Sequence, residues 1–70
     1  MKEYIKSHLL DFRTKNKVTQ QEIAEKIGVT RQTIFAIEKG RYTPSVALAL
    51  RLAKFFNVKV EEIFEIIEKN

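Results

Sequence analysis

Cysteine is absent from this chain, and histidine and proline occur once each, as His8 and Pro44. Without cysteine there is no disulfide framework and no thiolate metal site, and a single histidine argues against an imidazole-based metal site. No apolar run reaches the roughly 18 residues of a membrane-spanning helix, and the N-terminus lacks the apolar run of a signal peptide. We therefore expect a soluble, cytoplasmic protein that uses no cofactor, no metal and no membrane.

Glycine is also scarce, and its two positions, Gly28 and Gly40, fall with Pro44 between segments of helical periodicity. Helix-breaking residues confined to connections favour helices joined by short links. A chain of 70 residues, 44% of them hydrophobic, suffices for one small core. The sequence predicts one all-α domain over residues 1–70, with five helices.

Charge is unevenly distributed along the chain. The formal net charge is +4, yet residues 31–59 carry six Lys or Arg against Glu38 alone, while residues 60–70 carry four Glu against Lys69. A basic middle beside an acidic tail indicates a polyanion partner for the middle only, although scattered Lys and Arg also keep small domains soluble.

Apolar spacing places the five helices. The first is expected from Lys2 or Glu3 to Asn16, with His8 partly buried at the edge of its apolar stripe rather than acting as a ligand. The second opens with the capping box Thr19-Gln20-Gln21-Glu22 and ends at Gly28. The third follows Thr30 as its N-cap and ends at Gly40.

The last two helices are less regular. The fourth, Val46 to Phe56 behind Ser45, is apolar nearly all round and is expected at the centre of the bundle, ending at Asn57. The fifth begins near Val60 with the stripe Val60, Ile63, Phe64 and Ile67, although the tail could instead form a short strand. Residues 60–70 are a candidate dimerisation element.

The unit 19–40 is the segment that carries chemistry. Two short helices meet there at a tight turn, and the second opens with Arg31 and Gln32. Arg can make paired hydrogen bonds to guanine, Gln can make them to adenine, and Phe35 could press on a thymine methyl. An ordinary solvated helix face, with Phe35 half-buried against a neighbour, is the alternative interpretation.

The stretch from Leu9 to Phe64 resembles the Cro/λ-repressor-type helix-turn-helix regulators, also called the xenobiotic-response-element family. The residues that carry the resemblance are Thr19-Gln20-Gln21-Glu22-Ile23-Ala24, Gly28-Val29-Thr30-Arg31-Gln32-Thr33-Ile34, Ile37-Glu38-Lys39-Gly40, Tyr42-Thr43-Pro44-Ser45 and Glu61-Glu62-Ile63-Phe64. The chain looks most like the small stand-alone members of the family, which have no ligand domain and work as homodimers.

The resemblance implies a role for individual residues. Arg31, Gln32 and Ala36 match base-reading positions, although Ala36 departs from the pattern because it cannot hydrogen-bond a base. Gln20 matches a phosphate contact at the start of the second helix. The end of the third helix and the following loop match the backbone grip, which comprises Lys39, Arg41, Tyr42 and Thr43. Thr30 and Thr33 could bind phosphate or act as cap and helix filler, and capping is favoured for Thr30.

Two further features concern architecture. Arg13 and Glu38 resemble a partly buried ion pair that links the first helix to the third, so Arg13 is not expected to contact DNA. Leu10 and Ile66 lie off the main apolar stripes, and exposed apolar residues can mark an interface, although single surface hydrophobes are common. We expect a homodimer contact that includes Leu10, Phe64, Ile66 and Ile67.

The sequence thus predicts a regulator that binds double-stranded DNA as a homodimer at a pseudo-palindromic operator and acts as a repressor. An antitoxin-like or adaptor module that binds protein through the same fold is the alternative. An enzyme is not expected, because no nucleophile–base pair, acid pair or phosphate-cradling glycine loop is evident. No small-molecule ligand is indicated either.

Overall fold

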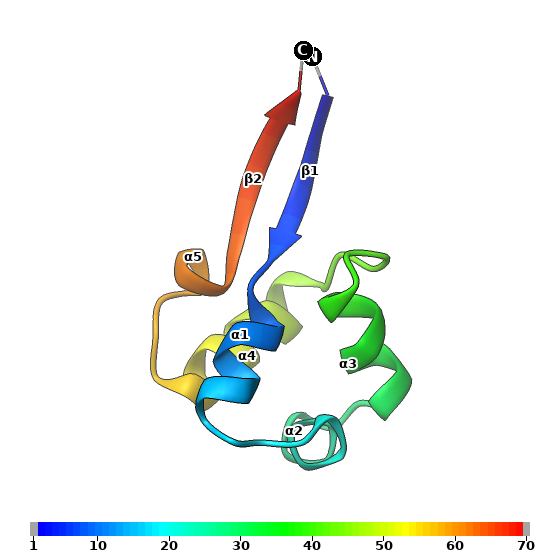
Figure 1. Ribbon diagram of the computed structural model, residues 1–70, viewed down its shortest axis with the longest axis vertical. Helices are drawn as coiled ribbons and strands as arrows, with labels where there is room; N and C mark the ends of the chain where they lie inside the picture. Colours follow the sequence, from blue (N-terminus) through cyan, green and yellow to red (C-terminus); the bar gives the residue numbers. More distant parts are fainter. Residues whose placement is uncertain (1, 70) are drawn as a thin grey trace.

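The computed structural model describes residues 2–69, which form a helical body with a two-stranded ribbon standing on it (Figure 1). The ribbon makes the molecule elongated, with extents of 37 × 22 × 21 Å. The elements follow in the order β1 (Lys2–Ser7), α1 (Leu9–Lys15), α2 (Gln20–Ile27), α3 (Arg31–Glu38), α4 (Val46–Phe56), α5 (Val60–Ile63) and β2 (Phe64–Lys69). Among residues 2–69, none of the helices has the length and apolar character needed to cross a membrane.

The predicted start and stop signals of α2 are confirmed. The Thr19 hydroxyl accepts a hydrogen bond from the Glu22 amide at 3.0 Å, and the Glu22 carboxylate accepts one from the Thr19 amide at 2.8 Å. This reciprocal box satisfies two of the amides that a helix start leaves free. Gly28 then ends α2 with φ of 87°, a conformation that costs glycine little because it has no Cβ.

The same logic sets the ends of α4. The Ser45 hydroxyl accepts a hydrogen bond from the Leu48 amide at 3.1 Å, and Asn57 ends the helix in the left-handed region with φ of 56°. Both features were expected from the sequence. The caps fix where each helix begins, and therefore which side chains of the helix turn toward the core.

One apolar core lies between the helices. Its largest fully buried side chains come from five different helices, so no helix is held by a single neighbour: Leu9, Ile23, Ile34, Ile37, Leu52 and Ile63. The partly buried rings of Phe12 and Phe56 pack against this core, with their centroids 5.7 Å apart.

The prediction of an all-α fold is wrong at the N-terminus. Residues 2–7 form a strand, and the first helix covers only Leu9–Lys15. The local sequence does not decide between the two structures, because Ile5, Leu9 and Phe12 are spaced for a helix while Tyr4 and Ile5 also favour a strand. The backbone amide of His8 donates to the Ile63 carbonyl at 2.7 Å, which ties the end of β1 to the far end of the chain.

The prediction of a long fifth helix is also wrong, and the alternative of a strand is confirmed. Helix α5 is a single turn, and β2 pairs antiparallel with β1, so that Ser7 lies opposite Phe64 and Lys2 opposite Lys69. The Glu62 carboxylate accepts a hydrogen bond from the Lys59 amide at 2.9 Å, which supports the turn although Lys59 is an unusual N-cap. Phe64 and Ile67 therefore continue as a strand, not as a helix stripe.

Helix α4 is less buried than its composition predicts. Leu48, Leu52 and Ala53 are buried, but Val46 is 76% exposed and Leu50 is 54% exposed. The Arg51 guanidinium donates to the Ile27 carbonyl at the end of α2, at 3.0 Å. The helix therefore packs along one side only, and a five-helix body of this size does not enclose it.

Candidate nucleic-acid interface

Helices α2 and α3 form a compact unit across a three-residue turn. The amides of Gly28 and Val29 both donate to the Ala24 carbonyl, at 2.8 and 3.0 Å, which closes the end of α2. Thr30 caps α3, because its hydroxyl accepts from the Thr33 amide at 3.3 Å. The two threonine hydroxyls also lie 3.1 Å apart, so the structure gives Thr30 and Thr33 a capping role, and a phosphate would have to share them.

The outward face of α3 displays most of the predicted base-reading residues. Arg31 and Gln32 are exposed in its first turn, and Phe35 is 39% exposed one turn later. Ala36 is half-buried, so its methyl group is only partly accessible to a ligand. The Lys39 ammonium lies 5.5 Å from the centre of the Phe35 ring, within the range of a cation–π contact. The face is therefore polar at its start, aromatic in the middle and cationic at its end.

The Glu38 carboxylate on α3 joins this unit to α1. It accepts hydrogen bonds from Arg13 Nε and from Arg13 Nη2, the latter at 3.2 Å, and from Gln20 Nε2 at 2.9 Å. Arg13 Nη1 also donates to the Val18 carbonyl at 3.1 Å. The side chains of Arg13 and Glu38 are only 16% and 4% exposed, so this cluster is structural and holds α1, α2 and α3 in fixed relation.

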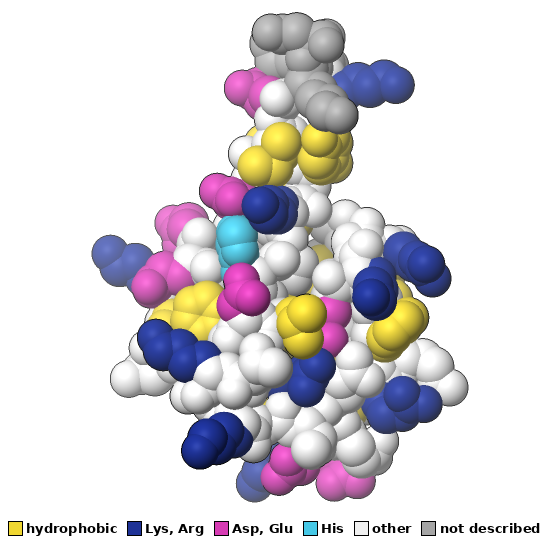
Figure 2. All heavy atoms as spheres, in the orientation of Figure 1, with side chains coloured by type: hydrophobic (Ala, Val, Ile, Leu, Met, Phe, Trp, Pro, Cys, Tyr) yellow, Lys and Arg dark blue, Asp and Glu magenta, His cyan; other side chains and the backbone are white. Residues whose placement is uncertain are grey.

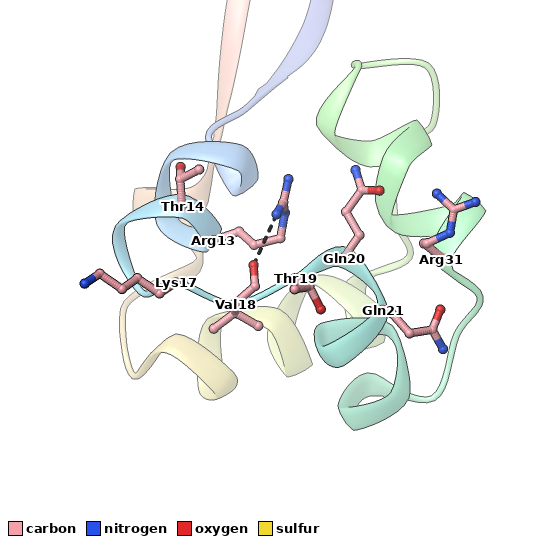
Figure 3. A pocket seen from close by; sticks show the side chains of 8 residues that line it. All are labelled: Arg13, Thr14, Lys17, Val18, Thr19, Gln20, Gln21 and Arg31. Atoms are coloured by element: carbon pink, nitrogen blue, oxygen red, sulfur yellow. Dashed lines mark hydrogen bonds between the residues drawn. The ribbon is translucent and has the colours of Figure 1, made fainter.

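A groove of about 610 Å³ opens at the start of α2 (Figure 3). Arg31 reaches it from the first turn of α3, and Gln20 and Gln21 reach it from α2, whereas Lys17 points away from the others in Figure 3. Gln20 Nε2 donates one hydrogen to Glu38, and its second hydrogen is available to an anion. A helix start with free amides also attracts anions, so this groove suits a phosphate.

Four groove residues were given no role by the sequence analysis: Thr14, Lys17, Val18 and Gln21. Lys17 has a positive φ of 56°, in the tight link between α1 and α2. The sequence could have indicated Lys17, because it lies two residues before the capping box and therefore beside the start of α2. Thr14 is contributed by α1, and only the packing of α1 on the unit reveals it.

The predicted backbone grip follows α3 directly. Gly40 has φ of 72°, and the Arg41 amide donates back to the Ala36 carbonyl at 2.9 Å, so the chain turns sharply out of the helix. Arg41, Tyr42 and Thr43 are exposed on this loop. The structure thus brings them beside Lys39 at the C-terminal end of the exposed face.

The four predicted dimer residues do not form one surface. Ile66 is 59% exposed and Phe64 half-buried, and they line a mainly apolar hollow of about 400 Å³ on the outer side of α5. Ile67 lies opposite Tyr4 on the other face of the ribbon. Leu10, 45% exposed on α1, is not among the residues that line the hollow.

Charged side chains of both signs cover the helical body. Figure 2 shows Lys and Arg side chains spread over the helical body among Asp and Glu side chains, with hydrophobic side chains both on the ribbon and on the body. Hydrogen bonds from the Thr19 backbone amide, and secondarily from its side chain, hold the pKa of Glu22 below its usual value, so this carboxylate is ionised at neutral pH. The carboxylate at the start of α2 therefore belongs to the cap and is not a proton donor.

Several known proteins are similar to this chain in sequence and in fold. The family model described as Helix-turn-helix matches residues 9–63. An uncharacterized HTH-type transcriptional regulator of Methanocaldococcus jannaschii is 53% identical over 60 residues, which cover 86% of this chain and 91% of that protein. The cryptic phage CTXphi transcriptional repressor RstR of Vibrio cholerae is 36% identical over 64 residues, 91% of this chain and 58% of RstR.

A solved structure extends the similarity to the ribbon. The transcriptional regulator VanUg superposes with a TM-score of 0.77 over 99% of this chain and 92% of that one, at 17% identity, a level that supports the fold alone. The matched region includes the capped α2, the turn and the exposed α3 described above. On these matches and this geometry, the chain belongs to the helix-turn-helix family of DNA-binding transcriptional regulators.

Proposed function

We propose that the protein is a transcriptional repressor that inserts α3 into the major groove of a pseudo-palindromic operator. An eight-residue helix is ~12 Å long, and the major groove is about 12 Å wide. The observation that carries the proposal is the exposed pair Arg31 and Gln32 at the start of a helix held in place by the Glu38 cluster. Rigid support matters because base readout depends on hydrogen-bond geometry.

Two side chains supply most of the sequence choice. Gln32 pairs with an adenine edge and Arg31 with a guanine edge, each contributing about 1–3 kcal/mol of discrimination. Phe35 covers a thymine methyl or a sugar edge, and Ala36, half-buried beside it, adds only an apolar contact.

Phosphate contacts supply most of the affinity. At one end, Gln20 donates its second amide hydrogen beside the start of α2. At the other end, Lys39, Arg41, Tyr42 and Thr43 contact the backbone, with Thr30 and Thr33 as further donors. Such contacts orient the protein on the duplex without reading its sequence.

Two copies act together in this proposal. A two-fold dimer places two α3 helices about 34 Å apart, in successive major grooves on one side of the duplex. The exposed Ile66 and the hollow beside α5 support a contact on the ribbon side of the molecule, with Leu10, Phe64 and Ile67 as the other candidates. The repressive sense rests on the similarity to RstR, and occlusion of polymerase is the mechanism.

Salt dependence tests the proposal. Each phosphate contact contributes a slope of about −0.9 to log K against log salt concentration. A dimer with six to ten contacts loses roughly 10³–10⁵-fold in affinity between 50 and 200 mM salt. A protein-binding module with the same fold would show no duplex binding, or a response to salt that is flat, and either result would contradict the proposal.

A further inference from the structure

The base of the ribbon and the end of α3 enclose a second groove, of about 430 Å³. Its lining comes from three parts of the chain: Tyr4, Ile5, Lys6 and Ser7 on β1, Ile67 on β2, and Glu38, Lys39 and Gly40 at the end of α3. A smaller hollow of about 270 Å³ continues it from Tyr4 and Gly40 to Thr43. The groove therefore adjoins the residues to which we assign the backbone grip.

Two polar side chains of β1, Tyr4 and Lys6, share one face of the ribbon beside this groove. Strand pairing places Tyr4 opposite Ile67 and Lys6 opposite Glu65, and residues directly opposite in an antiparallel pair share a face. Tyr4 is 47% exposed and Lys6 is exposed as well. A phenol and an ammonium thus stand on β1 beside the end of α3.

The charge available at this groove is positive. The Glu38 carboxylate is already bound by Arg13 and Gln20. The Glu65 carboxylate is hydrogen-bonded to His8 Nε2 at 3.0 Å. Within residues 2–69, Lys6 and Lys39 take part in no ion pair. Glu3 lines the smaller hollow and opposes their charge there, so the larger groove is the favourable position for an anion.

We infer that this face of β1 is a further DNA contact, in which Lys6 and the Tyr4 hydroxyl bind the phosphate backbone next to the segment held by Lys39. The inference rests on the proposed function, because the anion is the DNA strand that leaves the C-terminal end of α3. A strand gripped by Lys39, Arg41 and Thr43 runs past the mouth of the groove, where an ammonium and a phenol both donate to phosphate oxygens. The ribbon thereby lengthens the contact beyond the helix-turn-helix unit.

Lys6→Gln tests the inference, measured as the affinity for one fixed duplex across a series of salt concentrations. We expect the slope of log K against log salt concentration to become shallower by about 1.8, because each phosphate contact contributes about 0.9 and the dimer carries two copies of Lys6. Sequence preference should not change, because a backbone contact carries no base information. Lys6→Arg should restore the slope. Lys54→Gln is the matched control, an exposed lysine on α4 that lines neither hollow, and it should leave the slope as in the wild type.

Three results would overturn the inference, and they differ from a failure of the proposed function. The slope of Lys6→Gln could equal that of the wild type while thermal melts show both proteins folded. Lys54→Gln could lower the slope equally, which would show that any lysine has this effect. Lys6→Gln could alter the monomer–dimer equilibrium at unchanged slope, which would make the groove a contact between copies. If the wild type does not bind duplex DNA, the proposed function itself fails.

Discussion

At the scale of single residues, Glu38 has the widest structural influence. Its carboxylate receives three side-chain hydrogen bonds, from α1 and from α2, while it stands on the last turn of α3. Burying a charge is costly unless partners compensate it, and here the partners lie on the helices that must be held together. The position of α3, which we propose as the reading helix, therefore depends on a mostly buried residue outside the proposed base-reading set.

Glu38→Ala is expected to lower the free energy of unfolding by ~3–5 kcal/mol, because it leaves the mostly buried Arg13 uncompensated. Urea denaturation gives the measurement. The double variant Glu38→Leu with Arg13→Met is the control, and it should be more stable than Glu38→Ala, because it removes both charges. A Glu38→Ala protein as stable as the wild type would contradict the role given to this ion pair.

The ends of the sequence-derived elements show what local patterns can predict. The Thr19–Glu22 box, the Ser45 cap and the turns at Gly28 and Asn57 were all predicted, because each depends on residues within one helical turn. The bond from Gln20 to Glu38 was not, since it spans 18 residues and requires the packed helices.

At the scale of elements, the ribbon marks the limit of sequence reasoning. Ser7 pairs with Phe64 and Lys2 with Lys69, at opposite ends of the chain. Both segments also carry apolar residues at helical spacing, so the local pattern could not distinguish strand from helix. A two-stranded ribbon is marginal alone, and here its base is anchored to the core through the His8–Ile63 hydrogen bond.

The cap of α2 makes a pH-dependent contribution to stability. Hydrogen bonding from Thr19 depresses the pKa of Glu22 in the folded protein, so the unfolded chain takes up this proton at a higher pH. The stabilisation is therefore present at pH values above the ordinary glutamate pKa, and is lost as the pH falls through the depressed value. Glu22→Gln should be less stable than the wild type at pH 7, with the difference shrinking toward pH 3.

Thermal melts of both proteins across this pH range measure the effect. Glu25→Gln serves as the control, an exposed glutamate on the same helix outside the capping box. A gap between wild type and Glu22→Gln that stays constant with pH would show that the carboxylate charge has no part in the cap.

At the scale of the whole molecule, the exposed apolar side chains are the candidates for a contact between copies. Ile66 on the ribbon and Val46 and Leu50 on α4 are each more than half exposed, at 59%, 76% and 54%. Ile66 also adjoins a mainly apolar hollow, which is lined by Val60 and Phe64. We therefore propose that two copies meet there.

Ile66→Lys should dissociate the dimer, because a charge in a contact between apolar surfaces would be buried without a partner. Sedimentation equilibrium measures the result, and operator affinity should fall with the loss of the second half-site. Leu50→Lys is the control, with similar exposure on α4. If Leu50→Lys dissociates the dimer and Ile66→Lys does not, copies meet through α4, and the ribbon contact is wrong.

Selection from random duplex DNA tests the central claim most directly, with the wild type and Gln32→Ala compared under the same conditions. We expect the wild type to select two inverted half-sites with centres about 10–10.5 base pairs apart, which is one helical turn. Gln32→Ala should retain binding and this spacing but lose preference at one position of each half-site, by the roughly 1–3 kcal/mol of a paired contact. An unselective wild type, or a Gln32→Ala protein with an unchanged preferred sequence, would contradict the assignment of α3 as the reading helix.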